Sequence, residues 1–289
     1  MITYIYNMRN ILISTLFLSG FLTPTHGQWE PGLPYLPSGH FVASAFHHPD
    51  TGIFAYGNEV NDMSIYATFN GAEGPGYVIL SAYLRIKDVA VRMVNDKPFY
   101  VAAGRYRHAA FEAPPSRSII IRPIDHLNDP FELDTVLVGG PWRVFRCIAF
   151  ASDEVLFAGG GQGQFTLSGI IDRSDDGGIL WSTIAEFPGV VTKLKFVDEQ
   201  TGFACTNGYE WHFWPACAPG AGEIYKTMDS GSSWVLVHGE EETGIADIAF
   251  WNDSHGLALT NDGRVLRSID SGTTWAAGGV IPFETLGYG

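Results

Sequence analysis

SDDGGILW at residues 174–181 is the first of three copies of one eight-residue pattern. TMDSGSSW at 227–234 is the second copy and SIDSGTTW at 268–275 is the third, and all read Ser/Thr-x-Asp-x-Gly-x-x-Trp. We call these three segments the Asp turns. Their aspartates lie 53 and 41 residues apart, a period that suits one four-stranded unit per repeat. The residues that define the pattern are Ser174, Asp176, Gly178 and Trp181; Thr227, Asp229, Gly231 and Trp234; and Ser268, Asp270, Gly272 and Trp275.

A second pattern interleaves with the Asp turns. KFVDEQTGFA (195–204) and AFWNDSHGLA (249–258) each have an apolar strand ending in Phe, then a polar turn and a Gly that opens the next strand. AFHHPDTGIFA (45–55) repeats this layout, AFASDEVLFA (149–158) does so without the Gly, and VRMVNDKPFYVA (91–102) fits loosely. The five units start near Phe46, Met93, Phe150, Phe196 and Phe250, at intervals of 47, 57, 46 and 54 residues.

Each unit is predicted to contain four short strands, because β-branched residues alternate with polar ones and no sustained helical period appears. In the fourth unit the strands are expected at 190–197, 202–206, 223–228 and 233–238. The sequence therefore predicts an all-β chain, a β-propeller of four-stranded blades. Five blades are recognisable, and six are the alternative if the first half contains another unit. Their expected limits are 38–87, 88–140, 141–188, 189–243 and 244–289, with Gln28 to Pro37 adding a strand that helps to close the ring.

The Asp turns resemble Asp-boxes, also called bacterial neuraminidase repeats, although Leu180 and Ser233 stand where Thr is usual and Thr227 replaces Ser. Together with the second pattern they resemble the propellers of photosystem II stability/assembly factors and of sortilin-type proteins. This resemblance covers residues 144–280 well and 38–143 weakly, where Thr68 to Gly71 is a candidate eroded copy. It implies that the boxes lie at the blade periphery, away from the ligand, and serve structure, as an Asp accepting backbone N–H groups in a turn would.

Composition sets limits on location and partners. Arg9, the apolar run from Ile11 to Leu22 and the small residues before Gln28 predict a signal peptide over 1–27 and a mature domain over 28–289. A retained N-terminal anchor is the alternative. The chain has 17 basic and 31 acidic residues, a net charge of −14, which argues against nucleic acid and against a basic membrane surface. We expect a secreted, periplasmic or cell-surface protein without membrane insertion after cleavage.

Nothing in the sequence requires an enzyme. Sialidases share Asp-boxes, but they also need an arginine cluster that an F-R-I-P segment announces, and this chain has no such segment. The expectation is therefore no catalytic residue, no cofactor and no metal site, since the Asp turns lack a cluster of oxygen ligands. A glycoside hydrolase of the same fold is the alternative, because 31 acids always supply carboxylate pairs.

Three cysteines remain in the predicted mature chain. Cys147 lies in the apolar run VFRCIAF and is expected to be a buried thiol. Cys205 and Cys217 flank eleven residues that read as a loop, TNGYEWHFWPA, and we predict a disulfide between them.

The binding surface is predicted on the face opposite the Asp turns. In a four-stranded blade the loop between strands two and three lies there, and this loop is long in blades two, three and four. Its aromatic and basic side chains suit a protein or a glycan partner, although the aromatics could instead fold the loop over the propeller mouth. The candidate ligand-binding residues are Arg105, Arg107, His108, Tyr209, Trp211, His212 and Trp214. The expected function is a non-catalytic binding or assembly scaffold.

Overall fold

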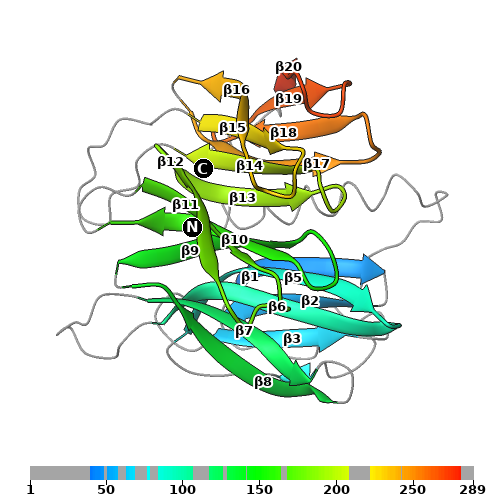
Figure 1. The fold of residues 1–289 in the computed structure, drawn as a ribbon. Helices are drawn as coiled ribbons and strands as arrows, with labels where there is room; N and C mark the ends of the chain where they lie inside the picture. The colour runs from blue at the N-terminus through cyan, green and yellow to red at the C-terminus, as the bar shows by residue number, and fades with distance from the viewer. Residues whose placement is uncertain are drawn as a thin grey trace, which may run out of the picture.

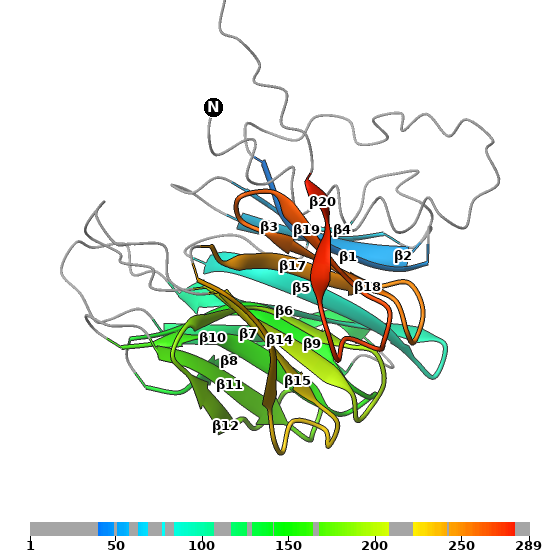
Figure 2. The same ribbon diagram turned by 90° about the horizontal axis from the view of Figure 1, so that it is seen from above.

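In the residues that it describes, the computed structural model is all-β and has five four-stranded antiparallel sheets, each a simple meander. Figures 1 and 2 show the sheets following one another in chain order, from blue to red, and we call them blades one to five. The structure describes residues 40–48, 51–57, 63–68, 77–78, 84–106, 117–125, 129–140, 142–163, 168–207, 222–241 and 243–280.

The strands of each blade run from the innermost to the outermost. Blade one has β1 (His40–His48), β2 (Thr51–Gly57), β3 (Met63–Thr68) and β4 (Tyr77–Val78). Blade two has β5 (Leu84–Val94), β6 (Lys97–Tyr106), β7 (Arg117–Asp125) and β8 (Asp129–Val138). Blade three has β9 (Arg143–Phe150), β10 (Leu156–Gln162), β11 (Ser168–Ser174) and β12 (Ser182–Phe187). Blade four has β13 (Val190–Phe196), β14 (Gly202–Asn207), β15 (Gly222–Thr227) and β16 (Val235–Glu240). Blade five has β17 (Ile245–Phe250), β18 (Gly256–Thr260), β19 (Arg264–Ser268) and β20 (Ala276–Val280).

The predicted β-propeller is confirmed, and its five predicted units correspond to the five sheets. In blade four the inner three strands begin and end within one residue of their predicted limits. The outermost strand begins at Val235, two residues later than predicted, because Trp234 still belongs to the Asp turn. The segment expected to close the ring, Gln28 to Pro37, lies outside the described residues.

Four hydrophobic clusters join consecutive blades. Each cluster combines side chains of one blade with side chains of the next, from blades one and two through blades four and five. At three of these contacts a Phe near the start of the second strand meets the Phe that ends the first strand of the following blade. Phe157 stacks on Phe196 with ring centroids 4.3 Å apart, Phe203 stacks on Phe250 at 4.6 Å, and Phe99 meets Phe150 edge-on at 5.3 Å. The Phe residues of the second sequence pattern therefore hold neighbouring blades together.

The contact between blades five and one differs from the others. Among the described residues no buried hydrophobic cluster joins these two blades, and Phe46, the counterpart of Phe196 and Phe250 in blade one, is 39% exposed.

The part of the chain that the structure describes has no helix with the length and apolar character needed to cross a bilayer.

Every innermost strand carries an irregularity at the same point. One extra residue interrupts the pairing with the second strand, which is a β-bulge. The bulged residues are Val42, Lys87, Arg146, Thr192 and Ala246. The residues that follow them are Ala43, Asp88, Cys147, Lys193 and Asp247, and we call this set the axial layer.

Candidate functional site

The Asp turns use their own carboxylates to close the loop between strands three and four. In the third turn Ser268 Oγ donates to Asp270 Oδ1 at 2.8 Å, and the Gly272 N–H donates to Ser268 Oγ at 2.9 Å. Asp270 also accepts from the Thr274 N–H at 2.9 Å and from Thr274 Oγ1 at 2.6 Å. These hydrogen bonds favour the ionised carboxylate and lower the pKa of Asp270 to about 2.

The other two turns repeat this geometry with their own side chains. Thr227 Oγ1 takes the role of Ser268 and donates to Asp229 at 2.8 Å, so the Ser-to-Thr change preserves the contact. Ser233 donates to Asp229 through both its N–H and its hydroxyl. In the first turn Leu180 has no hydroxyl, so Asp176 receives only backbone N–H groups from this end of the turn.

Hydrogen bonds fix which loops share a face. The Gly177 N–H donates to the Glu154 carbonyl at 2.9 Å, and the Ser271 N–H donates to the Ser254 carbonyl at 2.9 Å. Each Asp turn therefore lies beside the loop between strands one and two of its own blade. At the opposite end the Asn261 N–H donates to the Gly244 carbonyl at 2.8 Å, which places the loop between strands two and three beside the connection between blades. We call this opposite side the loop face.

Most of the predicted ligand-binding residues cannot be placed. Arg107, His108, Tyr209, Trp211, His212 and Trp214 lie outside the described residues. The structure describes Arg105, which is half-buried near the end of β6. In the strand register it lies opposite Arg85 of β5 and Ser118 of β7. The structure therefore neither assembles this set of residues nor separates it.

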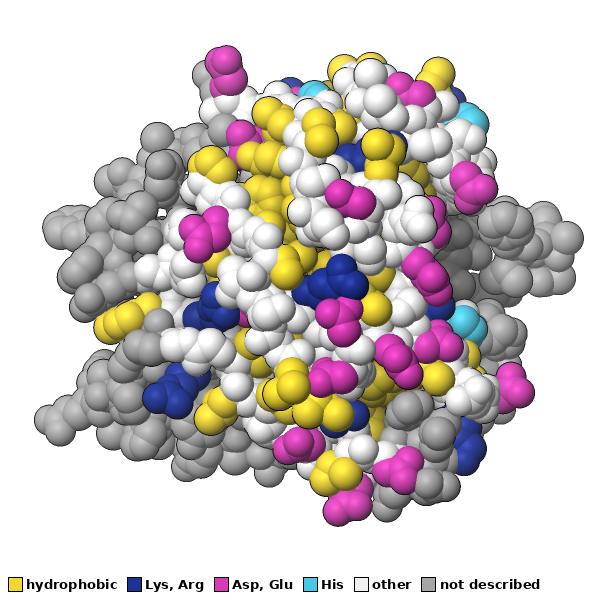
Figure 3. Space-filling model, viewed as in Figure 1, with side chains coloured by type: hydrophobic (Ala, Val, Ile, Leu, Met, Phe, Trp, Pro, Cys, Tyr) yellow, Lys and Arg dark blue, Asp and Glu magenta, His cyan; other side chains and the backbone are white. Residues whose placement is uncertain are grey.

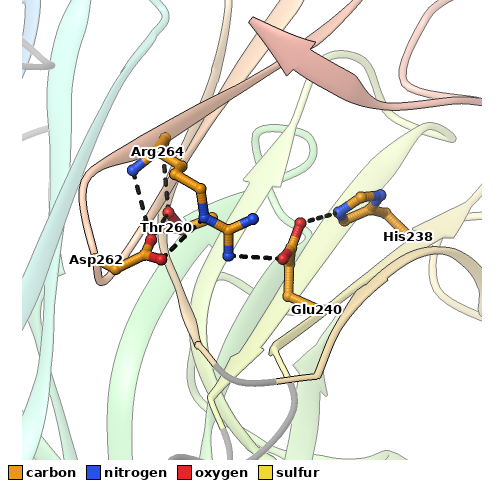
Figure 4. A network of polar contacts seen from close by, with 5 residues as sticks. All are labelled: His238, Glu240, Thr260, Asp262 and Arg264. Atoms are coloured by element: carbon orange, nitrogen blue, oxygen red, sulfur yellow. Dashed lines mark hydrogen bonds and ion pairs between the residues drawn. The ribbon is translucent and has the colours of Figure 1, made fainter. Parts of the chain in front are cut away.

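A network of polar contacts occupies the loop face of blades four and five (Figure 4). Glu240, near the start of the connection to blade five, accepts from Arg264 Nη2 at 2.8 Å and lies 2.9 Å from His238 Nε2. Arg264 also donates from Nε to Asp262 at 2.9 Å, and Thr260 donates to the same carboxylate. These contacts lower the pKa of Glu240 and of Asp262. The network therefore joins the end of β16 in blade four to the short turn between β18 and β19 in blade five.

Four residues of the axial layer, Ala43, Asp88, Lys193 and Asp247, line a cavity of about 660 Å³ that the innermost strands of all five blades surround. From blades three, four and five the cavity takes residues 148–150, 193–196 and 247–250, the part of each inner strand nearest the loop between strands one and two. It therefore lies toward the end of the propeller that carries the Asp turns. Sequence reasoning missed this site because its charged residues lie within strands that read as core.

Charges of both signs meet in the axial layer. Lys193 Nζ lies 3.7 Å from Asp247 Oδ1, and the carboxylates of Asp247 and Asp88 together raise the pKa of Lys193. Asp88 accepts the Ile148 N–H at 3.1 Å, but burial raises its pKa. The lysine therefore keeps its charge between two carboxylates from other blades.

Both cysteines that the structure describes are free thiols in the core. Cys147 is fully buried beside blade four, as predicted, and burial raises its pKa. Cys205 is fully buried between blades four and five. Its predicted disulfide partner, Cys217, lies outside the described residues, so the structure gives this bridge no support. Among the described residues no three His, Cys, Asp or Glu side chains gather as a metal ion would require.

Comparisons with known proteins give only distant similarities. No protein-family model matches the sequence, and no curated protein matches it. Among solved structures, YCF48 from Cyanidioschyzon merolae is 13% identical with a TM-score of 0.45, over 84% of this chain and 86% of that chain. A structure of YCF48 bound to D1 peptide is 16% identical with a TM-score of 0.41, over 85% of this chain and 87% of that chain. At these values neither structure assigns a ligand or a partner to this chain. The five four-stranded sheets of the described residues define a β-propeller.

Proposed function

We propose that this protein is an exported, non-catalytic binding or assembly scaffold that holds a protein or a glycan on the loop face. One observation carries the proposal. The charged groups of the Asp turns and of the blade junctions are bonded within the fold, whereas the long connections between strands two and three start from strand ends on the opposite face. The three Asp-turn carboxylates are bonded within their own turns. The connections between strands two and three span residues 107–116 in blade two and 208–221 in blade four, against three residues in blade five, so the fold does not require their length.

The arginines also support binding rather than sialidase chemistry. A sialidase-like site needs several arginines that converge on one carboxylate. Here Arg92 pairs with Asp153 at 2.6 Å, Arg143 pairs with Asp172 at 2.6 Å, and Arg264 pairs with Glu240 at 2.8 Å. These three arginines lie in blades two, three and five, and each is held by an acid of the protein itself.

The charge of the surface fits an extracellular partner better than a nucleic acid. Figure 3 shows acidic side chains spread over one face of the molecule, in agreement with the net charge of −14. Export itself rests on the sequence of residues 1–27. Mass spectrometry of the mature protein recovered from outside the cytoplasm tests it, and an intact Met1 in that fraction would contradict cleavage.

The binding proposal is tested with a panel of immobilised glycans and with chemical cross-linking in the native extract. The variant Trp211→Ala/Trp214→Ala is compared with Trp251→Ala, since Trp251 is 39% exposed in the loop between strands one and two of blade five. We expect the double variant to lose binding with its melting temperature unchanged and the control to keep binding. Retained binding by a folded double variant would contradict the proposed face.

A glycoside hydrolase is the second candidate, because Asp88 and Asp247 line one cavity and burial raises the pKa of Asp88. A carboxyl group with a raised pKa beside an ionised one is the arrangement that glycosidases use. However, both face Lys193, which their charges hold in its protonated form. Turnover of a glycoside panel that disappears in Asp88→Asn would favour this candidate over a scaffold.

A further inference from the structure

We propose that the axial cavity binds a small organic anion, an apolar body carrying one carboxylate, with Lys195 as its charged contact. The cavity of about 660 Å³ falls within the range of sites for small molecules. Small and aromatic side chains of several blades line it, among them Ala45, Ala90, Ala249, Phe150 and Phe196. Polar and charged groups contribute to the walls as well, so the cavity suits a ligand that combines a small apolar body with a charged group.

The charge of the cavity is opposite in sign to that of the whole protein. Its lining contains four cations, Lys87, Arg92, Lys193 and Lys195, against two carboxylates, Asp88 and Asp247. The chain as a whole carries a net charge of −14. A cationic cavity in an acidic protein concentrates anions from solution.

The cations of the cavity are not equivalent. Lys193 is held by Asp247 at 3.7 Å, and Arg92 is held at the rim by Asp153 at 2.6 Å. Lys195 lies two residues after Lys193 on the same face of β13, and it has no hydrogen bond or ion pair among the described residues. Its side chain is accessible to solvent, so a ligand can reach it.

The pKa of Lys195 is consistent with a lysine that has no ion-pair partner among the described residues. Desolvation by the surrounding side chains and the charge of Lys193 lower the pKa of Lys195, although its side chain reaches solvent, and the charge of Asp247 offsets only part of this. A bound carboxylate would supply the missing charge partner. The site is separate from the loop face, because the cavity lies toward the Asp turns.

The test uses the full mature protein, with benzoate as the probe and benzamide as its uncharged counterpart, measured by ligand-observed NMR titration. We expect saturable binding of benzoate and at least about tenfold weaker binding of benzamide. Lys195→Met should weaken benzoate at least about tenfold, and Lys195→Arg should retain it. Arg267→Met is the matched control, because Arg267 is an exposed cation on β19 outside the cavity.

The cavity itself is tested with Ala249→Trp, which fills it without changing charge. We expect this variant to keep its fold and to lose benzoate binding. If benzoate does not saturate the wild-type protein, or if it binds benzamide equally well, the proposal is wrong. Unchanged binding by folded Lys195→Met or by Ala249→Trp would overturn it as well. Because the loop-face residues are untouched, failure here leaves the proposed scaffold function standing.

Discussion

Arg173 of blade three donates from Nη1 to the backbone carbonyl of Ser230 in the Asp turn of blade four, at 2.7 Å. Lys226 repeats this contact one blade later, where its Nζ donates to the Ser271 carbonyl at 2.8 Å. Ser230 and Ser271 both have positive φ, 56° and 60°, which turns their carbonyls toward the preceding blade. The second and third Asp turns therefore each also receive a cation from the blade before them.

The contact between Lys226 and the Ser271 carbonyl predicts that Lys226 and Arg267, which precede the second and third Asp turns, contribute differently to stability. Lys226 is buried, and Lys226→Met would leave the Ser271 carbonyl without its charged donor. We expect a loss of about 2 kcal/mol in the free energy of unfolding, measured by urea denaturation. Arg267 occupies the same position before the third Asp turn but is exposed, so Arg267→Met should change stability by less than about 0.5 kcal/mol. Equal losses in both variants would contradict a role for the contact between blades.

The first Asp turn offers a stabilising substitution. Leu180 stands where Thr274 donates its hydroxyl to Asp270 in the third turn, and the Leu180 side chain is 73% exposed. Leu180→Thr should add the same hydrogen bond to Asp176 and raise the free energy of unfolding by about 0.5 kcal/mol. Leu180→Val, which has the same branched shape without a hydroxyl, is the control. A gain shared by both variants would assign the effect to shape alone.

The Asp270 carboxylate predicts a defined pH dependence. Its pKa falls from the ordinary 3.8 to about 2 in the folded protein, so its contribution is present above pH 3.8 and is lost as pH falls toward 2. The difference in unfolding free energy between the wild type and Asp270→Asn should therefore grow between about pH 2 and pH 4 and stay constant above. Denaturant titrations across this range measure it. A difference that does not change with pH would show that the carboxylate charge is not involved.

Much of this architecture follows from the sequence alone. The Asp turns and the Phe-to-Gly segments place the strands of blades three to five, because a turn with its own side-chain acceptor is specified locally. The axial layer does not follow from the sequence. Its charged residues lie within strands that read as core, and a bulge in β13 shifts the register so that Lys193 faces the cavity. The sequence does contain a pattern that could have predicted the contacts between blades. A basic residue directly precedes the Ser or Thr of every Asp turn, and these residues are Arg173, Lys226 and Arg267.

The two lysines of β13 are expected to respond differently to loss of charge. Lys193→Met would leave Asp88 and Asp247 facing each other near the axis, and we expect about 2 kcal/mol of destabilisation at neutral pH. Lys195→Met removes an exposed cation that has no hydrogen bond or ion pair among the described residues, so it should cost less than about 0.5 kcal/mol. Calorimetric unfolding of both variants gives the comparison. A larger loss for Lys195→Met would mean that the axial layer is wrongly assigned.

The position of the partner is the central claim, and site-specific photo-crosslinking in the cells that make the protein tests it most directly. A benzophenone amino acid is placed at Trp211 on the predicted loop-face segment, and separately at Trp251 on the side of the Asp turns. The account predicts a discrete crosslinked species from position 211 and none from position 251. Crosslinks from position 251 alone, or from neither position, would contradict a partner on the loop face.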